Sequence, residues 1–260
     1  MTLGHIVMFA GPSLPPDARP CDARLEWLPP AEAGDLLRLL DCPPDAICLI
    51  DGFFGRRPAP WHKEIMMLMA RGVAVFGAAS MGALRAAELR DYGMIGVGVI
   101  FNAYRRGLLT GDDEVACVHA PVDLGWAALT VPMVEVRATL AAAVRIRVID
   151  SEIARSLRAL AHNIHFDARD WAAMERVSVA SGVVTPARFD RLRRLHVPLK
   201  RMDALVCLSL AAGWSEAPAR CVPPPRTCYL DALDREVRAA TARSASTSAM
   251  NVAPAFAAKG

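Results

Sequence analysis

One stretch constrains the fold of this chain more than any other: residues 73–89, VAVFGAASMGALRAAEL. The apolar run at residues 73–76 predicts a short buried strand. A turn with a glycine at each end follows at residues 77–82, and residues 83–89 are strong helix formers. The stretch therefore places the hydroxyl of Ser80 on a strand-to-helix turn, beside the first free backbone N–H groups of a helix. Such a turn can hold a nucleophile next to donors for an anion.

Apolar runs at residues 5–10 and 46–50 predict two more buried strands. The spacing of apolar residues predicts helices over residues 31–40 and 61–70, and residues 94–101 predict a further strand. Strands that alternate with helices favour parallel pairing. The predicted fold class is therefore α/β, with a mostly parallel sheet core in the N-terminal half and a helical C-terminal half.

The chain divides into three parts on this pattern. Residues 1–130 are expected to form the α/β core that carries the active site, and residues 131–214 form a helical region packed on that core. Residues 215–260 combine a proline-rich segment, one helix over residues 229–241 and a disordered tail from residue 242.

Charge and apolar runs argue against several classes of protein. The formal net charge of +3 is too small to predict nucleic-acid binding, and no apolar stretch reaches the roughly 18 residues of a membrane helix. The N-terminus lacks the pattern of a signal peptide, so we expect a cytoplasmic protein with no membrane attachment. The seven cysteines form no C-x-x-C pair, which argues against a zinc ribbon and a disulfide framework. The sequence predicts no metal site and no cofactor.

The basic residues are 27 arginines and only three lysines, Lys63, Lys200 and Lys259. Arginine stays protonated, whereas burial can lower the pKa of a lysine until it acts as a base. A lysine in so arginine-rich a chain is therefore worth examining.

In a parallel α/β sheet the carboxyl ends of the strands meet at one edge, where ligands bind. Asp51 ends one predicted strand, and Ser80 follows the neighbouring one. His62 and Lys63 lie in the first turn of the helix between these strands. If the first strand is also parallel, the loop at residues 11–13 joins them. Topology alone thus brings these groups to one edge.

One interpretation of this edge is a Ser–Lys pair. Lys63 in its neutral form would take the proton of Ser80, for which burial near a helix N-terminus must lower its pKa. Backbone N–H groups nearby would form an oxyanion hole. The residues expected to supply these groups or to line the site are Gly11, Ser13, Asp51, His62, Met81, Gly82 and Arg85.

Three alternatives remain open on the residues alone. A triad of Ser80, His62 and Asp51 is the rival nucleophilic site. In the simplest reading Ser80 only caps the helix that follows it, and Lys63 is a solvated charge. The third reading is phosphate or nucleotide binding at the same helix N-terminus, with Lys63 as the counter-charge.

Several of these stretches together resemble the TfuA-like protein family. The matching pieces run in order over residues 5–212, and the most specific of them is SMGALRAAEL at residues 80–89. The others are VMFAGPSL at residues 7–14, IDG-x-F at 50–54, WHKEI at 61–65, YGMIGVG at 92–98, DDEV at 112–115 and KR-x-DA at 200–204.

The resemblance implies an accessory protein for a YcaO enzyme in backbone thioamidation, in ribosomal peptide (RiPP) biosynthesis or on methyl-coenzyme M reductase. It implies that the protein hydrolyses the thiocarboxylate of a ThiS-like sulfur-carrier protein through a Ser–Lys pair, releases sulfide and helps to recruit the YcaO substrate. Carried over by motif, Ser80 is the nucleophile and Lys63 the base. The implied partners are the YcaO enzyme, the sulfur carrier and, optionally, a precursor peptide. The alternative function is a non-catalytic adaptor that docks YcaO to its peptide substrate.

Overall fold

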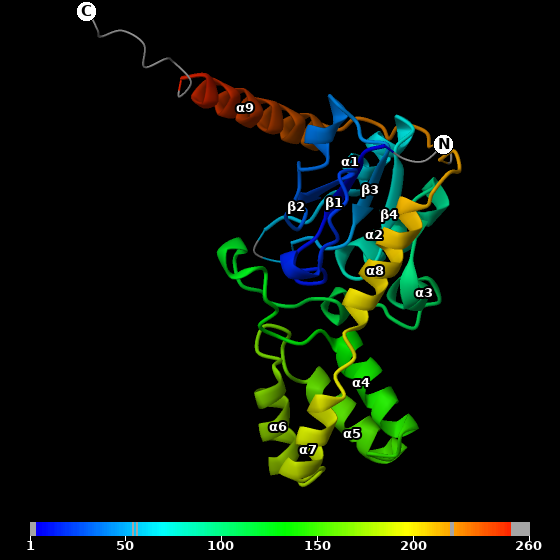
Figure 1. Cartoon of the computed structure of the whole chain (residues 1–260), viewed down its shortest axis with the longest axis vertical. Helices are drawn as coiled ribbons and strands as arrows, with labels where there is room; N and C mark the ends of the chain where they lie inside the picture. Colours follow the sequence, from blue (N-terminus) through cyan, green and yellow to red (C-terminus); the bar gives the residue numbers. More distant parts are fainter. Residues whose placement is uncertain (1–3, 54, 56, 219–220, 251–260) are drawn as a thin grey trace, which may run out of the picture.

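Five parallel strands form one sheet in the N-terminal half of the molecule (Figure 1). The computed structural model describes residues 4–53, 55, 57–218 and 221–250. The strand order is β2-β1-β3-β4-β5, and every neighbouring pair is parallel. The bounds of the strands are β1 Ile6–Phe9, β2 Leu25–Leu28, β3 Ala46–Leu49, β4 Ala74–Gly77 and β5 Ile95–Gly96. The predicted α/β class with a parallel sheet is confirmed.

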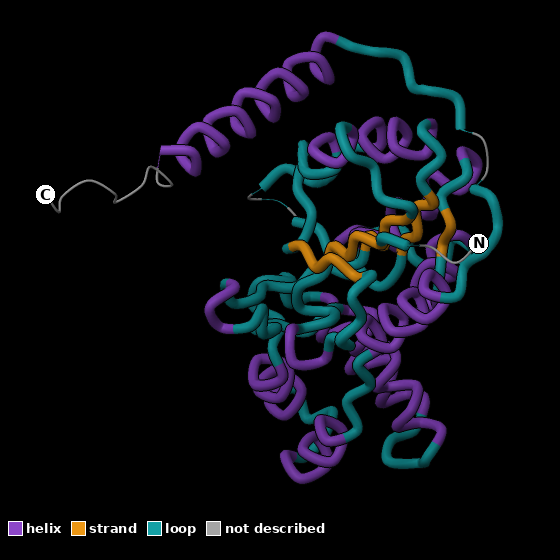
Figure 2. The backbone as a smooth tube through the Cα atoms, turned by 45° about the horizontal axis from the view of Figure 1, so that its top comes forward, coloured by secondary structure: helices purple, strands orange, loops and turns teal. Residues whose placement is uncertain are grey.

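Helices cover both faces of this sheet, because its central strands are apolar on both sides (Figure 2). Alternate residues of β1 belong to different apolar clusters, with Phe9 in one and Met8 in the other. The cluster around Phe9 includes residues of α1 (His62–Ala70) and α2 (Met81–Leu89), and the cluster around Met8 includes residues of α8 (Leu199–Ala212). The sheet is therefore the middle of three layers.

The C-terminal half is mostly helical, as predicted, and four of its helices form a second lobe below the sheet (Figure 1). The helices α4–α7 share an apolar cluster of their own, in which Leu157 and Phe189 are buried. Their bounds are α4 Met133–Arg145, α5 Ser151–His162, α6 Trp171–Ala180 and α7 Pro186–Arg194. We call residues 133–194 the helical lobe.

The last described helix, α9 (Cys228–Met250), packs on the sheet lobe near its start and then leaves the body of the molecule (Figure 1). Leu230 and Val237 are buried in the apolar cluster that contains Phe9. The helix continues past the end expected at residue 241. The part of the expected disordered tail at residues 251–260 lies outside the described residues. In the described part of the chain, no helix is long and apolar enough to cross a membrane.

The helix predicted over residues 31–40 is wrong, because only Leu37–Leu40 form a short 3-10 turn there. Gly34 adopts a φ of +94°, and its N–H donates to Oε2 of Glu64 at 2.8 Å. The N–H of Ala31 donates to the carbonyl oxygen of Asp51 at 3.0 Å. Hydrogen bonds to distant parts of the chain thus replace the helix that local spacing favours. The other 3-10 turns are Pro16–Ala18, Arg90–Tyr92, Asp112–Glu114 and Val122–Leu124.

The strand predicted over residues 94–101 is also wrong, since β5 covers only Ile95–Gly96 and helix α3 (Gly98–Arg105) follows at once. Asp203 of α8 caps this helix. Its two carboxylate oxygens accept the N–H groups of the second and third residues of α3, at 2.9 and 2.8 Å. A Cβ on Gly98 would lie 2.3 Å from Cγ of Asp203, so only glycine fits there. The capping residue is more than 100 positions away, beyond the reach of a local pattern.

Helix α2 approaches the sheet so closely that two glycines are required. A Cβ on Gly82 would lie 1.6 Å from the carbonyl oxygen of Leu49, and one on Gly77 would lie 2.2 Å from the carbonyl oxygen of Gly82. The approach allows the N–H of Gly82 to donate to the carbonyl oxygen of Ile50 at 3.3 Å. It fixes the start of α2, and with it Ser80, against the end of β3.

We expect Gly82→Ala to lower the free energy of unfolding by roughly 3 kcal/mol, because the new methyl group meets backbone rather than a flexible side chain. Gly72→Ala is the matched control: its φ is +84°, but no atom lies within 4 Å of the added Cβ. The control isolates backbone strain and should cost about 1 kcal/mol. Urea unfolding followed by circular dichroism measures both variants. Equal losses would contradict the close approach.

Glu64 joins helix α1 to the segment before it. Its carboxylate oxygens accept the N–H of Gly34 at 2.8 Å and the N–H of Trp61 at 3.0 Å, and the residue is fully buried. Burial raises the pKa of Glu64 from 4.5 to about 7, although both hydrogen bonds oppose the shift. The native state therefore holds a proton that the unfolded chain releases at a lower pH.

This proton makes stability depend on pH. Between about pH 4.5 and pH 7 the unfolded state binds fewer protons at Glu64 than the native state, so the free energy of unfolding falls as pH rises, by about 3 kcal/mol in all. Glu64→Gln should flatten this fall. Glu152→Gln, at an exposed position of α5, should leave it unchanged. Unfolding in urea across this pH range provides the measurement, and an unchanged slope in Glu64→Gln would contradict the assignment.

Candidate active site

Ser80 occupies the turn between β4 and α2. Ala79 before it adopts a φ of +64°, a conformation that is rare for a residue with a side chain. The Ser80 hydroxyl does not cap α2, and donates instead to the carbonyl oxygen of Val115 in a long contact of 3.4 Å. The residue is only 4% exposed. A strained turn thus holds a buried serine that has no capping role.

Lys200, in the first turn of α8, reaches the same carbonyl group. Its Nζ donates to the oxygen of Val115 at 3.0 Å and lies 3.6 Å from Sγ of Cys117. The nearest carboxylate oxygen is Oδ1 of Asp51, at 3.9 Å. The hydroxyl of Ser80 and the amine of Lys200 therefore share one acceptor in the interior of the protein.

The surroundings of Lys200 keep its amine protonated. Burial lowers the pKa of Lys200, but Cys117, Asp51 and Glu135 raise it, and the net shift of the pKa is upward. Burial also raises the pKa of the Cys117 thiol, which is therefore uncharged at neutral pH. The attraction on the ammonium group at neutral pH then comes from the two carboxylates.

Asp51 binds the loop that follows β1. Its Oδ2 accepts the N–H groups of Gly11 and Ser13, both at 2.9 Å, and its Oδ1 accepts the Ser13 hydroxyl at 2.6 Å. The carboxylate is buried and also faces the ammonium group of Lys200. One side chain therefore links the ends of β1 and β3 to the start of α8.

These groups open into a cavity of about 260 Å³, which we call the Ser80 cavity. Ser80, Asp51 and Lys200 are buried at its inner end. Three aromatic side chains, Phe53, His119 and Phe166, are among the less buried residues that line the cavity, and the guanidinium of Arg57 lies 4.0 Å from the centre of the Phe53 ring. The described residues include no group of three or more His, Cys, Asp or Glu that could hold a metal ion.

Three residues expected at the site lie elsewhere. Lys63 is half-buried, and its Nζ donates to the carbonyl oxygen of Pro225 at 2.8 Å. His62 and Arg85 both contact the carboxylate of Glu88. None of the three lines the Ser80 cavity. The structure therefore brings together neither Ser80 with Lys63 nor Ser80 with His62.

The expected oxyanion donors are mostly occupied. The N–H groups of Gly11 and Ser13 donate to Asp51, and the N–H of Gly82 donates to the carbonyl oxygen of Ile50. The N–H of Met81, at the first position of α2, has no acceptor among the described residues. Of the expected donors, the Met81 N–H is thus the one without an acceptor among the described residues.

Residues 51–170 match the model of the family described as TfuA-like protein. Over this segment the chain is similar to the TfuA-like family. The match includes Asp51, Ser80, Val115 and Cys117, and it ends before Lys200. No curated protein matches the chain.

Sequence reasoning assigned no role to Lys200, although two signals pointed to it. It is one of only three lysines, and it belongs to the KR-x-DA stretch at residues 200–204. The strand-edge argument could not include it, because α8 is far from β3 and β4 in the sequence. The packing of α8 on the sheet is what carries Lys200 to the strand ends.

We expect Asp51→Asn to lower the free energy of unfolding by about 3 kcal/mol, because three charge-assisted hydrogen bonds weaken and Lys200 loses a buried partner. Asp45→Asn is the matched control, since Asp45 also accepts two backbone N–H groups, at 2.7 and 2.9 Å, at an exposed position. It should cost about 1 kcal/mol. Urea unfolding compares the two, and a smaller loss in Asp51→Asn than in Asp45→Asn would contradict the role given to Asp51.

Proposed function

We propose that this protein is a YcaO-associated accessory hydrolase in thioamidation, which releases sulfide from a thiocarboxylated, ThiS-like sulfur-carrier protein. The similarity of residues 51–170 to the TfuA-like family supports the accessory role. One observation carries the hydrolase activity: a buried serine and a buried lysine meet at the carbonyl group of Val115, inside a cavity. In this proposal Ser80 is the nucleophile, and Lys200 takes the part that the motif resemblance gives to Lys63.

The protonated form of Lys200 suits a first step in which this residue donates a proton to the substrate. A thiocarboxylate is an anion, and the ammonium group is the cation that would meet it beside Ser80. Transfer of a proton from Lys200 to sulfur gives a neutral thioacid, whose carbonyl carbon accepts a nucleophile more readily. The same transfer leaves Lys200 as a neutral amine, the form that a general base needs.

The neutral amine then takes the proton of Ser80 as its oxygen attacks the carbonyl carbon. The tetrahedral intermediate breaks its C–S bond, hydrosulfide leaves, and the carrier tail stays on Ser80 as an ester. Water hydrolyses this ester, which frees the carboxylate and restores the serine. Lys200 gives one proton and takes one in the first half, so it returns to its ammonium form, and hydrolysis of the ester then restores Ser80.

The start of α2 offers a hydrogen-bond donor for the negative charge that forms on the carbonyl oxygen in this reaction. The N–H of Met81 is free of other acceptors among the described residues, and it lies at the positive end of the helix dipole. We assign it the oxyanion of the tetrahedral intermediate. The left-handed Ala79 sets this donor and the Ser80 hydroxyl on one turn.

The Ser80 cavity suits a slender chain end rather than a folded surface. Its volume of about 260 Å³ is small, and Phe53, His119 and Phe166 are among the less buried residues that line it. A carrier tail must pass these rings before its thiocarboxylate reaches Lys200. The guanidinium of Arg57 also lines the cavity, where it binds the carboxylate of Glu32 at 2.6 Å.

The test is sulfide release from purified thiocarboxylated carrier. Ser80→Ala and Lys200→Met should each lower kcat about 100-fold or more, because a nucleophile or an acid–base group is lost while side-chain volume is roughly kept. Lys63→Ala is the matched control and should stay within about twofold of the wild type, since its amine binds the carbonyl oxygen of Pro225 and Lys63 does not line the Ser80 cavity. Melting temperatures show that the variants fold.

Two results would change the proposal. A loss in Lys63→Ala as large as in Lys200→Met would return the base to Lys63. Full sulfide release by Ser80→Ala would remove the nucleophile and favour a non-catalytic adaptor that docks YcaO, with or without a precursor peptide. Thioamidation assays with YcaO, with and without added sulfide, separate the adaptor from the hydrolase.

A further inference from the structure

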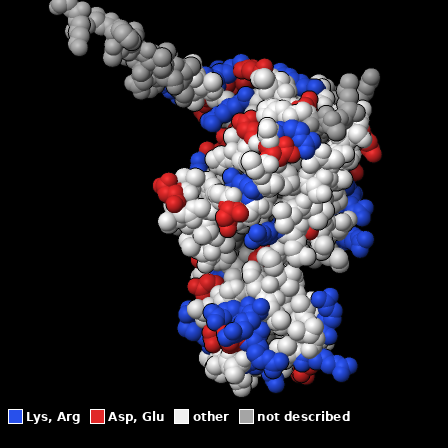
Figure 3. All heavy atoms as spheres, viewed as in Figure 1, with Lys and Arg blue, Asp and Glu red and all other residues white. Residues whose placement is uncertain are grey.

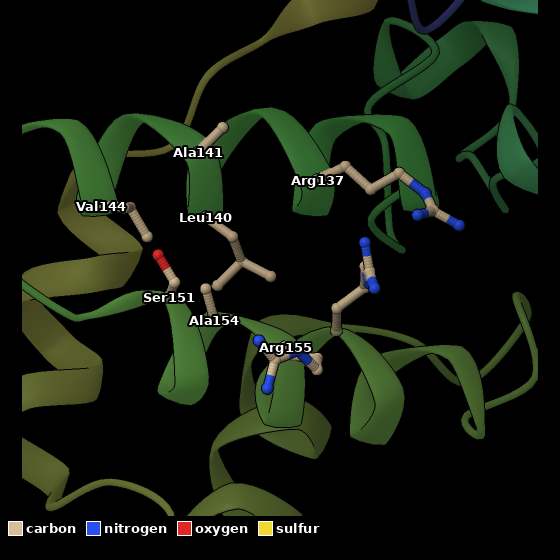
Figure 4. A pocket seen from close by; sticks show the side chains of 8 residues that line it. Arg137, Leu140, Ala141, Val144, Ser151, Ala154 and Arg155 are labelled. Carbon is tan, nitrogen blue, oxygen red and sulfur yellow. The ribbon is translucent and has the colours of Figure 1, made fainter. Parts of the chain in front are cut away.

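The helical lobe carries a groove that the proposed hydrolysis does not use. It has a volume of about 450 Å³ and lies between α4 and α5, and no residue that lines it also lines the Ser80 cavity. Figure 4 shows the two helices facing each other across it, with Leu140 and Val144 on α4 and Ala154 on α5. Small and aliphatic side chains thus form most of its walls.

Arginines supply the charge of this groove. Arg155 and Arg158 lie one turn apart on α5, both are exposed, and neither has an ion pair or a hydrogen bond with the described residues. Arg137 of α4 also lines the groove, and its guanidinium binds the carboxylate of Glu114 through two nitrogens. Two free cationic groups and one partly neutralised group therefore border an apolar floor.

The excess of basic side chains extends over the helical lobe. Figure 3 shows basic side chains gathered on the lower part of the molecule, where α5, α6 and α7 lie in the same view. Between residues 131 and 198 there are 11 arginines and only seven aspartates and glutamates. Two like charges one turn apart on α5 repel each other, and a negatively charged partner relieves that repulsion.

We propose that this α4–α5 groove docks an acidic amphipathic helix of a partner protein. Arg137 and Val144 lie two turns apart on α4, so the groove accommodates a helical face about 10 Å long. Apolar side chains of the incoming helix at positions i, i+3 and i+7 fill the space over Leu140 and Ala154. Carboxylates on the flank of that helix pair with Arg155 and Arg158.

A helix fits these features better than a small anion does. The unpaired arginines are exposed, so they do not form the closed, desolvated cradle that fixes a small anion. The apolar walls also contribute nothing to a bare anion. Because the groove is separate from the Ser80 cavity, the inference does not depend on the proposed hydrolase activity.

The test uses the full-length protein and a fluorescent peptide of about five helical turns, with leucine at positions i, i+3 and i+7 and glutamate on both flanks. Fluorescence anisotropy measures its binding. Arg155→Glu/Arg158→Glu should weaken binding roughly tenfold or more, and rising salt should weaken binding to the wild type. Ala141→Trp should have a similar effect without changing any charge, because Ala141 is an exposed wall of the groove.

Arg188→Glu/Arg191→Glu is the matched control. These arginines are also exposed, one turn apart and in the helical lobe, but they lie on α7, outside the groove. This variant should bind the peptide within about twofold of the wild type. An equal loss in the control variant, equal binding of a scrambled peptide of the same composition, or more effective competition by a short DNA duplex would each overturn the proposal.

Discussion

The carboxylate of Asp51 is the interaction on which the site depends. It is buried at the end of β3. Its two oxygens accept the N–H groups of Gly11 and Ser13 and the hydroxyl of Ser13, all in the loop after β1. A buried charge needs partners of this quality, since desolvation costs several kcal/mol otherwise. Oδ1 of Asp51 also lies 3.9 Å from Nζ of Lys200, so the carboxylate attracts the ammonium group. The same side chain thus shapes the strand edge and holds a cation beside the serine.

Helix α8 connects this edge to the rest of the molecule. Its first turn supplies Lys200, and Asp203 in its next residues caps α3. Its apolar residues cover one face of the sheet, so both polar side chains are held by packing rather than by local turns. The two lobes are also joined here, since Glu135 of α4 accepts the N–H of Lys200 at 3.2 Å. A shift of the helical lobe would therefore be felt at Lys200.

The sequence was informative wherever structure is decided locally. Apolar runs gave β1, β3 and β4, and the glycine-bounded turn gave the position of Ser80. It failed where distant groups decide: Glu64 binds Gly34 and breaks a predicted helix, and Asp203 converts a predicted strand into α3. Lys63 was chosen as the base because it lies near the strand edge in the sequence. Its amine nevertheless binds the carbonyl oxygen of Pro225, and Lys63 does not line the Ser80 cavity.

The carbonyl group of Val115 has a consequence for mutational scanning and for engineering. It orients both the hydroxyl of Ser80 and the amine of Lys200, yet it belongs to the backbone, and every amino acid supplies it. A scan that replaces side chains would register Val115 only through its volume, and would miss the acceptor that aligns the two groups. Transplanting this site to another scaffold would therefore require the path of the 112–117 segment, and not only the identities of Ser80, Lys200 and Asp51. This part of the site depends on the backbone conformation of residues 112–117 and not on the identity of any single side chain.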